Sequence, residues 1–469
     1  MDEMENRELM DFETIHEKRS DELTELLDKR DMKQLQRRME EMNEFDVAEF
    51  LTEIEDNRMP MVFRLLSKET AADVFANFEA PEQERIINSI TDSELAGIIE
   101  ELYVDDAVDM MEEMPANVVR RVMRAATPAT RSLINQYLRY PENSAGSIMT
   151  SEFVDLKKYM NVREAIARIR RIGEDKETIY TCFVTSADRK LEGVVSVKDL
   201  LLNDDETVVG DIMDTNVVFC MTQDDQEEAA EKISDYDLMA LPVTDREGRL
   251  VGIVTVDDVI DVMEKEATED FEIMAAMTPS DKPYSRTGAF DIWKNRVPWL
   301  LFLMLSATFT TMILNSFEEA LAVQTVLIGF VPVIMGTGGN SGAQSSTAII
   351  RSISLGDTEP ADVLRVVWKE WRVSILCGVS LAAVNFVKML LVDRLLMNNP
   401  DVTVTVALTV SLAIVLTVMF AKVVGSSLPI LAEKIGVDPA VVATPLITTI
   451  SDAVSLLIYL EIARLLIHV

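Results

Sequence analysis

The chain has 469 residues, of which 80 are acidic and 44 basic, so its formal net charge is -36 although 48% of its residues are hydrophobic. Counting from Ser285 onward gives 12 Lys/Arg and 13 Asp/Glu, which leaves 32 Lys/Arg and 67 Asp/Glu in the first 284 residues. An acidic half of this kind repels nucleic acid and favours cations as partners, beside the ordinary alternative of a well-solvated surface.

The cysteine spacing and the first residues bear on the cellular compartment of the soluble half and on membrane insertion. Cys182, Cys220 and Cys377 match no disulfide or metal-ligand spacing, which suits a soluble half in a reducing cytosol. Residues 1–11 are acidic and lack the apolar core of a cleavable signal peptide. We therefore expect internal segments to direct membrane insertion.

The amino-terminal part, residues 1–143, is predicted to be an all-α domain. Short amphipathic stretches such as 71–75 and 94–99 recur between polar or Pro-containing breaks. Their spacing predicts a small superhelical stack of helix pairs. Asp105 and Asp109 lie four residues apart on one predicted helix, which by itself fits an ordinary solvated face.

An internal repeat follows the helical part. Residues 193–201 match residues 252–260, and an Ile-Met-Thr or Ile-Met-Asp element begins each copy, at Ile148 and Ile212. Strands alternating with amphipathic helices predict two α/β units. We expect their bounds to be 144–206 and 207–264.

These two units resemble a pair of cystathionine-β-synthase (CBS) domains, which are regulatory modules that often bind adenosine nucleotides. The resemblance is specific for the fold and weak for any ligand. It puts Asp199 where such sites often have a ribose partner, so ATP is a candidate ligand.

Seven carboxylates crowd the predicted helical stretch 257–270, which leads toward the membrane. Like charges three and four residues apart destabilise a helix unless something neutralises them. Carboxylate oxygens are what hard divalent cations bind, although a merely acidic linker remains the alternative. A connecting helix is expected over residues 265–291.

Five apolar stretches approach the roughly 20 residues that a helix needs to cross a bilayer. They predict a five-helix transmembrane domain over residues 292–469. The stretches are Trp299–Phe317, Val323–Ile350, Val373–Leu396, Val402–Leu431 and Ala440–Ile467. Basic residues gather before the first span, between the second and third, and after the fourth, so we expect a cytosolic amino terminus and a carboxyl terminus outside.

Polar groups inside the predicted spans are few. Asp452 is a carboxylate at membrane depth, which is costly unless it faces protein, water or an ion. Thr444, Thr448, Asp452 and Ser455 recur at helical spacing and form one polar stripe. A helix-packing hydrogen bond is the alternative role for this aspartate.

Further polar and helix-breaking residues accompany it. In the second span Asn340 and Gln344 share a face, beside glycines whose small-xxx-small spacing allows close helix approach. Pro332, Pro429 and Pro445 are expected to interrupt spans two, four and five and to free backbone carbonyls there.

Over nearly its whole length the chain resembles the MgtE family of magnesium channels. The resemblance is carried by the helical amino domain, the paired CBS units, the segments 255–259 and 266–270, Gly336–Asn340, and 438–440 leading to 448–452. It implies a homodimer with the pore on the two-fold axis, so that Asp452 is presented twice to one ion. It also implies that cytosolic Mg²⁺ bridges the amino domain, the CBS pair and a connecting "plug" helix and closes the pore.

The resemblance assigns roles to individual residues. The Mg²⁺ ligands it implies, beside Asp452, are Asp73, Asp105, Asp109, Glu227, Asp237, Asp258, Asp261, Glu266, Glu269, Asp270 and Asp438. The pore-lining residues would be Asn340, Gln344, Thr444 and Thr448.

The expected function is Mg²⁺ uptake across the cell membrane, gated by cytosolic Mg²⁺. A transporter of Mn²⁺ or Co²⁺ is the nearest alternative, and channel-like and coupled transport both stay open. A CBS-gated anion channel would line its pore with basic groups, and a membrane-tethered sensor would not need the polar stripe. The sequence shows no nucleophile–base pair or phosphate loop, so no enzyme is expected.

Overall fold

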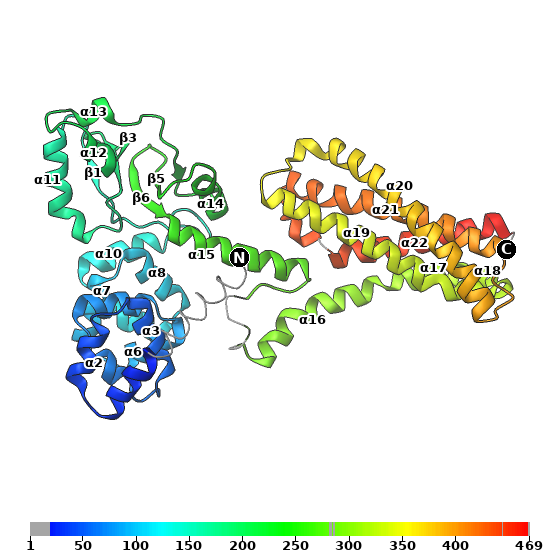
Figure 1. The fold of residues 1–469 in the computed structure, drawn as a ribbon, viewed down its shortest axis with the longest axis horizontal. Helices are drawn as coiled ribbons and strands as arrows, with labels where there is room; N and C mark the ends of the chain where they lie inside the picture. The colour runs from blue at the N-terminus through cyan, green and yellow to red at the C-terminus, as the bar shows by residue number, and fades with distance from the viewer. Residues whose placement is uncertain (1–18, 281–283, 285–286, 443, 468–469) are drawn as a thin grey trace, which may run out of the picture. The chain divides into compact units, whose positions relative to one another are not determined.

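The computed structural model describes residues 19–280, 284, 287–442 and 444–467. The chain forms two compact units, Met1–Met263 and Glu264–Val469, and each is described here by itself (Figure 1). The first unit holds a helical domain and a CBS pair, and the second holds the long apolar helices. This agrees with the multidomain fold class expected from the sequence.

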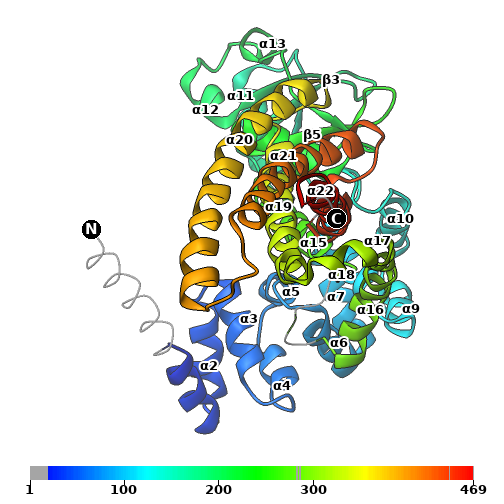
Figure 2. The same cartoon turned by 90° about the vertical axis from the view of Figure 1, so that its right-hand side faces the viewer.

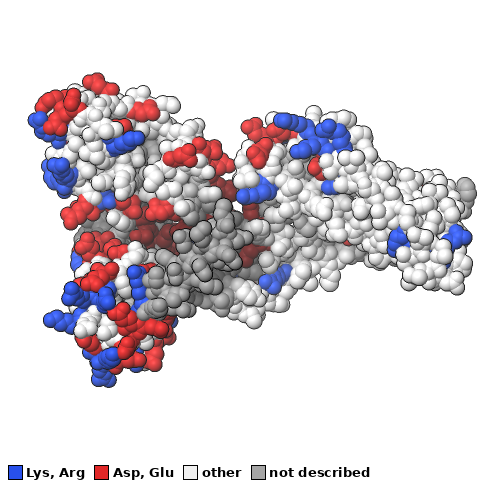
Figure 3. Space-filling model, in the orientation of Figure 1, with Lys and Arg blue, Asp and Glu red and all other residues white. Residues whose placement is uncertain are grey.

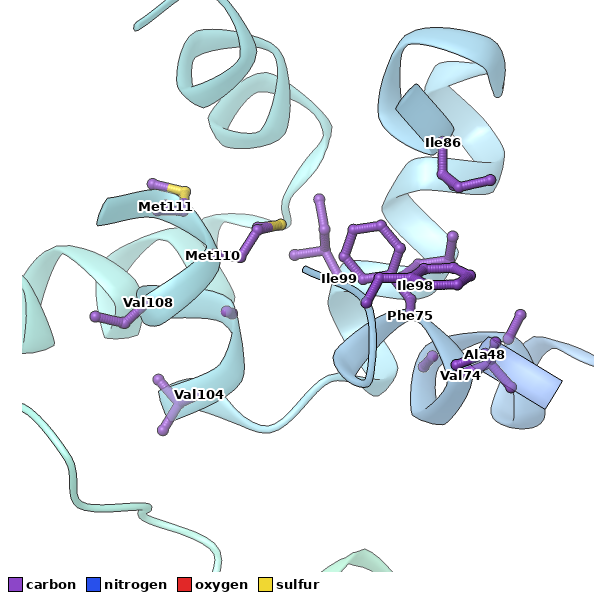
Figure 4. Close-up of a cluster of buried hydrophobic side chains, with 14 of the residues drawn as sticks. Ala48, Val74, Phe75, Ile86, Ile98, Ile99, Val104, Val108, Met110 and Met111 are labelled. Atoms are coloured by element: carbon purple, nitrogen blue, oxygen red, sulfur yellow. The ribbon is translucent and has the colours of Figure 1, made fainter. Parts of the chain in front are cut away.

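The helical domain is a succession of short helices. They are α2 (Met32–Met39), α3 (Glu44–Glu53), α4 (Met59–Phe63), α5 (Lys68–Ala76), α6 (Ala80–Ser89), α7 (Asp92–Glu101), α8 (Val104–Glu113), α9 (Ala116–Ala125) and α10 (Pro128–Tyr137). Apolar side chains from successive helices, among them Phe75, Ile86, Ile99 and Met110, form one buried core (Figure 4). The helices are short because a capping residue or a proline interrupts the chain about every ten residues.

Side-chain caps define several of these helix starts. Asn43, Ser67 and Thr127 each accept a hydrogen bond from a backbone amide in the first turn of α3, α5 and α10. Thr91 and Glu94 form a complete capping box at α7, in which each side chain binds the backbone amide of the other. Such caps satisfy amide groups that have no partner within the helix.

The CBS pair contains two three-stranded sheets of identical plan. They are built from β1 (Asp155–Leu156), β2 (Thr181–Thr185) and β3 (Leu191–Ser196), and from β4 (Cys220–Met221), β5 (Ala240–Thr244) and β6 (Leu250–Thr255). In each sheet the first pairing is parallel and the second antiparallel, with a register shift at the same place. The helices of the pair are α11 (Val162–Ile172), α12 (Val197–Leu202), α13 (Val209–Ile212) and α14 (Gln226–Asp235). The internal repeat is therefore a repeat of structure.

The two copies interlock through their glycines. A Cβ atom on Gly193 would contact Met213 and Asp214, and one on Gly252 would contact Met149 and Thr150. Isolated β-bridges join the same segments, Val194 with Asp214 and Thr150 with Ile253. Each Ile-Met element thus packs against the other copy, which explains why the motif occurs twice.

The connecting helix differs from its expected bounds. Helix α15 runs without a break from Val256 to Met274, so the last helix of the CBS pair and the acidic stretch are one element. It ends at Met274 instead of near residue 291, and residues 275–280 are not helical. Ala275 and Ala276 close the helix with backbone hydrogen bonds, and Ala276 adopts a left-handed conformation at φ 53°.

The second unit contains five helical segments long and apolar enough to cross a membrane, within the residues described. Their elements are α16 (Ala289–Ser306) with α17 (Thr308–Ser316), α19 (Val331–Ser354), α20 (Val363–Lys388) with a π-helix (Met389–Leu396), α21 (Val404–Lys434) and α22 (Thr444–Ile467). A short helix, α18 (Glu318–Val323), lies between the first two spans. The five predicted spans are confirmed, and the first starts ten residues earlier than expected.

The prolines of the spans act differently from the prediction. Pro332 lies in the first turn of α19, where the missing amide costs no intrahelical hydrogen bond. Pro445 lies at the start of the described part of α22. Pro429 lies inside its helix and frees the carbonyl of Gly425 as predicted, and Pro298 is a further internal proline that the expected start at Trp299 excluded.

Helix α21 is the centre of the transmembrane bundle, since it packs against α19, α20 and α22. Figure 2 shows α22 nearly end-on, with α19 and α21 beside it. A Cβ atom at Gly425 would overlap the carbonyl oxygen of Gly342, and one at Gly338 would overlap the hydroxyl of Ser455. At Gly425 the backbones of α19 and α21 approach too closely for any side chain, and at Gly338 the side chains of Ser455 and Thr417 already fill the space.

Candidate functional site

The first candidate site is an acidic cluster in the first unit, formed by carboxylates of α8, the start of α15 and the loop before β2. Helix α8 buries Val104 and Met111 in the helical core (Figure 4), and this packing fixes the carboxylates of the same helix. We use the name acidic cluster for Asp105, Asp106, Asp109, Glu177, Asp257 and Asp258. Figure 3 shows that acidic side chains are plentiful on the surface of this unit, whereas the bundle of the second unit is mainly uncharged.

The β6–α15 junction places the cluster's central member. The hydroxyl of Thr255, the last residue of β6, donates a hydrogen bond to Asp258 Oδ2. The equivalent residues of the other CBS copy are Ser196 and Asp199, which form the same pair at the start of α12. The same capping arrangement therefore fixes Asp199 and Asp258. Of these two aspartates, Asp258 is the one that belongs to the acidic cluster.

Crowding raises the pKa values of the cluster. Burial, and next the nearby Asp258, raises the pKa of Asp106 to about 7. Burial together with Asp258 raises the pKa of Glu177 to about 8. Burial is again the main cause for Asp258, whose pKa rises to about 6, and for Asp105, whose pKa lies well above its ordinary value. The folded unit thus holds carboxylates that repel one another when ionised.

The cluster offers oxygens to a cation. Asp105 is 9% exposed, and its Oδ1 atom and Glu177 Oε2 are buried without a hydrogen-bond partner in the described part of the chain. Among residues 19–280, 284, 287–442 and 444–467, no three acidic, His or Cys side chains are arranged as a ready metal cage. Mg²⁺ keeps several of its waters and needs only one or two direct carboxylates, so an open carboxylate cluster suits this ion.

Sequence-predicted ligands of the first unit fall into two groups. The first group lies close enough for its charges to raise the pKa values of one another or of Asp106, and it consists of Asp73, Asp105, Asp109 and Asp258. For Asp73 the largest cause of the raised pKa is burial. The second group is exposed and consists of Glu227, Asp237 and Asp261. These three are not among the carboxylates whose charges contribute most to the raised pKa values of the cluster. Their role as ligands stays a prediction.

The second candidate site surrounds Asp452 in the transmembrane bundle. The side chains of Asp452 and Thr448 lie against Gly339 of α19, each 3.4 Å from the place where a Cβ atom would stand. Ser451 lies against Gly342, and Ser455 against Gly338. We call this contact the hydroxyl seam, formed by Gly338, Gly339 and Gly342 of α19 and by Thr448, Ser451, Asp452 and Ser455 of α22.

The predicted polar stripe of α22 is therefore placed against a helix that carries no side chains there. Ser451 and Ser455 are fully buried, and their hydroxyl oxygens have no hydrogen-bond partner among the described residues. The hydroxyl of Thr448 donates to the Pro445 carbonyl at 2.9 Å. Thr444 begins the helix, and its side chain lies outside those described. Asn340 and Gln344 are both exposed, and both lie on α19.

A third acidic group lies within the second unit, where the end of α15 approaches the loop before α22. Burial raises the pKa of Asp270, and Asp438 and Glu266 add to the rise while Arg351 opposes it. Asp438 also accepts a hydrogen bond from the Ala440 amide at 2.7 Å, which fixes it at the start of a short 3₁₀ turn. Of the predicted ligands in this region, Glu266, Asp270 and Asp438 are thus close to one another.

Several charged residues of these sites were missed by sequence reasoning. Asp106 and Asp257 adjoin predicted ligands, and their doubled acidic pairs were the available signal. Glu177 lies in a loop between α11 and β2 and carries no pattern that marks it. Outside these sites, Lys422 lies within the predicted fourth span, where a charge is unusual, and Glu370 lies on α20 just before the predicted start of the third span.

Comparisons with known proteins agree with this architecture. The divalent cation transporter domain of MgtE matches residues 331–462, the MgtE intracellular N domain matches 42–143, and the CBS domain matches 145–205 and 209–265. The fold and its membrane helices define a multi-pass divalent cation transporter.

Curated relatives identify the family. The chain is 40% identical to the magnesium transporter MgtE of Thermus thermophilus over 97% of this chain and 100% of that protein. It is 30% identical to the Bacillus subtilis magnesium transporter MgtE over 92% of this chain and 93% of that protein. The crystal structure of the soluble part of a magnesium transporter is 31% identical, with a TM-score of 0.52, and covers 54% of this chain and 99% of its own. The chain belongs to the MgtE family of magnesium transporters, and it is a transporter and not an enzyme.

Proposed function

We propose that this protein takes up Mg²⁺ past Asp452 and that Mg²⁺ bound at the acidic cluster closes this path. The observation that carries the proposal is Asp452, a carboxylate within a membrane-spanning helix that faces glycines and hydroxyls. A hydrated Mg²⁺ gives up its water reluctantly, and the two Asp452 carboxylates that the resemblance implies on the two-fold axis can hold it without stripping the water shell.

The acidic cluster supplies the gate. Without a cation its ionised carboxylates repel one another, which favours separation of α8 from the start of α15. Bound Mg²⁺ cancels that repulsion and favours the compact state. The group formed by Glu266, Asp270 and Asp438 connects the same helix, α15, to the loop before α22, and Glu269 belongs to the same stretch. A cation there would link the sensor to the transmembrane bundle.

Assembly and orientation complete the proposal. The protein acts as a homodimer in the cell membrane, with its amino terminus in the cytosol and its carboxyl terminus outside. The family resemblance supports the dimer, and the placement of basic residues between spans supports the orientation. ATP binding at the CBS pair is proposed on the resemblance alone. In the structure the Asp199 carboxylate accepts a hydrogen bond from the backbone amide of Ser196 at 3.2 Å, so it already has a partner within the chain.

The test is Mg²⁺ entry into vesicles that contain wild-type protein, Asp452→Asn or Asp401→Asn. Asp401 is an exposed aspartate of the same unit and serves as the matched control. We expect entry in the wild type and the control and none above background in Asp452→Asn. Equal entry in all three would remove Asp452 from the path, and no entry in any would favour a sensor without a pore. Competition by Mn²⁺ or Co²⁺ at equal concentration would instead favour a broader divalent transporter.

A further inference from the structure

A lysine is buried inside the transmembrane bundle where three helices meet. The side chain of Lys422, on α21, is 7% exposed, and that of Glu370, on α20, is 16% exposed. Lys422 Nζ lies 3.1 Å from Ser345 Oγ of α19 and 3.8 Å from Glu370 Oε2. The Ser345 hydroxyl in turn donates to Glu370 Oε2 at 2.7 Å. The three side chains form a closed triad that joins α19, α20 and α21.

The energetics of a buried charge pair indicate that the triad fixes how the three helices pack. A charge in the hydrocarbon region is costly, and intramembrane ionisable residues are retained where they pair with one another. Removing one member of a buried pair leaves the other charge uncompensated, whereas replacing both by neutral groups is tolerated much better. The triad therefore holds its three helices in one arrangement.

The position of the triad links it to the hydroxyl seam. On α19, Gly338, Gly342 and Ser345 follow one another at helical spacing, so they share a face. Gly342 lies against Gly425 and against the carbonyl of Ala421, the residue before Lys422. The same stretch of α19 that the triad fixes therefore presents the glycines that contact Asp452 and its hydroxyl neighbours.

We propose that Lys422, Ser345 and Glu370 are positioning residues that hold α19 in the rotation at which Gly339 faces Asp452. They contact no transported ion. Their effect is on how tightly the ion is held at Asp452, because a small rotation of α19 moves the wall opposite that carboxylate. This inference rests on the proposed function, since it assigns the triad a role relative to the path.

The experiment measures Mg²⁺ entry against Mg²⁺ concentration for full-length protein in vesicles, normalised to folded protein. The variants are Lys422→Met, Glu370→Gln, both together, and the charge swap Lys422→Glu with Glu370→Lys. Lys434→Met, an exposed lysine of the same helix, is the matched control. We expect each single variant to raise the half-saturating Mg²⁺ concentration about tenfold, and the swap and the control to stay within about threefold of the wild type.

The outcomes separate this inference from the proposed function. Wild-type half-saturation in the single variants, or a swap as impaired as they are, would overturn the triad's role. If the single variants do not fold, the neutral double variant decides, because a purely structural pair predicts wild-type half-saturation there and a positioning role predicts a raised value. Absence of entry in the wild type would overturn the proposed function as well.

Discussion

The acidic cluster and the hydroxyl seam place the same chemical group in opposite settings. In the cluster, six carboxylates crowd together, and burial and mutual repulsion raise the pKa of Asp106 to about 7 and that of Glu177 to about 8. In the seam, one carboxylate stands among glycines and buried hydroxyls. A crowded cluster stores repulsion that a cation relieves, so it is suited to switching. One carboxylate from each protomer of the proposed dimer offers a binding place that an ion can leave, so it is suited to passage.

The difference also shows in what surrounds each site. The cluster depends on helix caps and on the CBS repeat, whose Thr255–Asp258 pair recurs at Ser196 and Asp199. The seam depends on glycines of α19 that lie against side chains of α22, and α19 also makes close backbone contact with α21 at Gly342 and Gly425. Changes of similar size should therefore have very different effects in the two regions.

The largest effect is expected from adding one methyl group to the bundle. Gly425→Ala places a Cβ atom on the carbonyl of Gly342, which forces α19 and α21 apart. Overpacking of this kind costs about 1–3 kcal/mol, and we expect Mg²⁺ entry to fall more than about tenfold. Gly336→Ala is the control, since nothing lies within 4 Å of its added atom. Equal entry for both variants would show that the close contact is not needed.

A pH-dependent effect of intermediate size is expected in the cluster. The pKa values of Asp258, Asp106 and Glu177, about 6, about 7 and about 8, lie above the unfolded values of about 4. These three groups bind more protons in the folded unit than in the unfolded chain, so their contribution to stability is fully present below about pH 4 and is lost as the pH rises through the folded values.

Hydrogen exchange on the full-length protein measures this effect. We expect the protection factors of α8 amides to fall between about pH 5 and pH 8 without Mg²⁺ and to change little with it. Amides of α11, in the same unit and outside the cluster, provide the internal reference. Protection of α8 that rises with pH would mean that the carboxylates do not repel one another in the folded state.

The smallest effect is expected at a helix cap away from both sites. Thr91→Ala removes the capping box of α7 and should lower the stability of the helical domain by about 1 kcal/mol. Chemical denaturation followed by circular dichroism measures the change. Mg²⁺ entry should be unaffected, and a strong loss of entry would show that the helical domain contributes more directly than we propose.

How much could be read from the sequence differs between the two regions as well. The five spans, the CBS repeat and the stripe containing Asp452 were predictable because periodicity and apolar length report local structure directly. The crossed packing of Gly193 and Gly252, and the placement of Glu177 beside Asp258, were not predictable, since they depend on tertiary contacts. Lys422 was visible as a charge in an apolar run, whereas Glu370 lies between Lys369 and Arg372, before the predicted third span. Only the fold shows that the two side chains face each other.

Boundaries were the weakest part of the prediction. The connecting helix is predicted over residues 265–291, whereas α15 begins at Val256 and ends at Met274. Pro332 is predicted to interrupt the second span, but it lies in the first turn of α19, where a helix tolerates proline. In both cases the sequence correctly predicts a helix but misplaces its first residue.

The most direct test of the account compares Mg²⁺ entry at low and high Mg²⁺ on the side of the acidic cluster. The variants are wild type, Asp106→Asn with Asp258→Asn, and Asp204→Asn with Asp235→Asn, which removes two exposed carboxylates from the same unit. We expect high Mg²⁺ to suppress entry in the wild type and in the exposed-site variant, but not in the cluster variant. Equal suppression in all three would contradict the claim that the cluster is the gate.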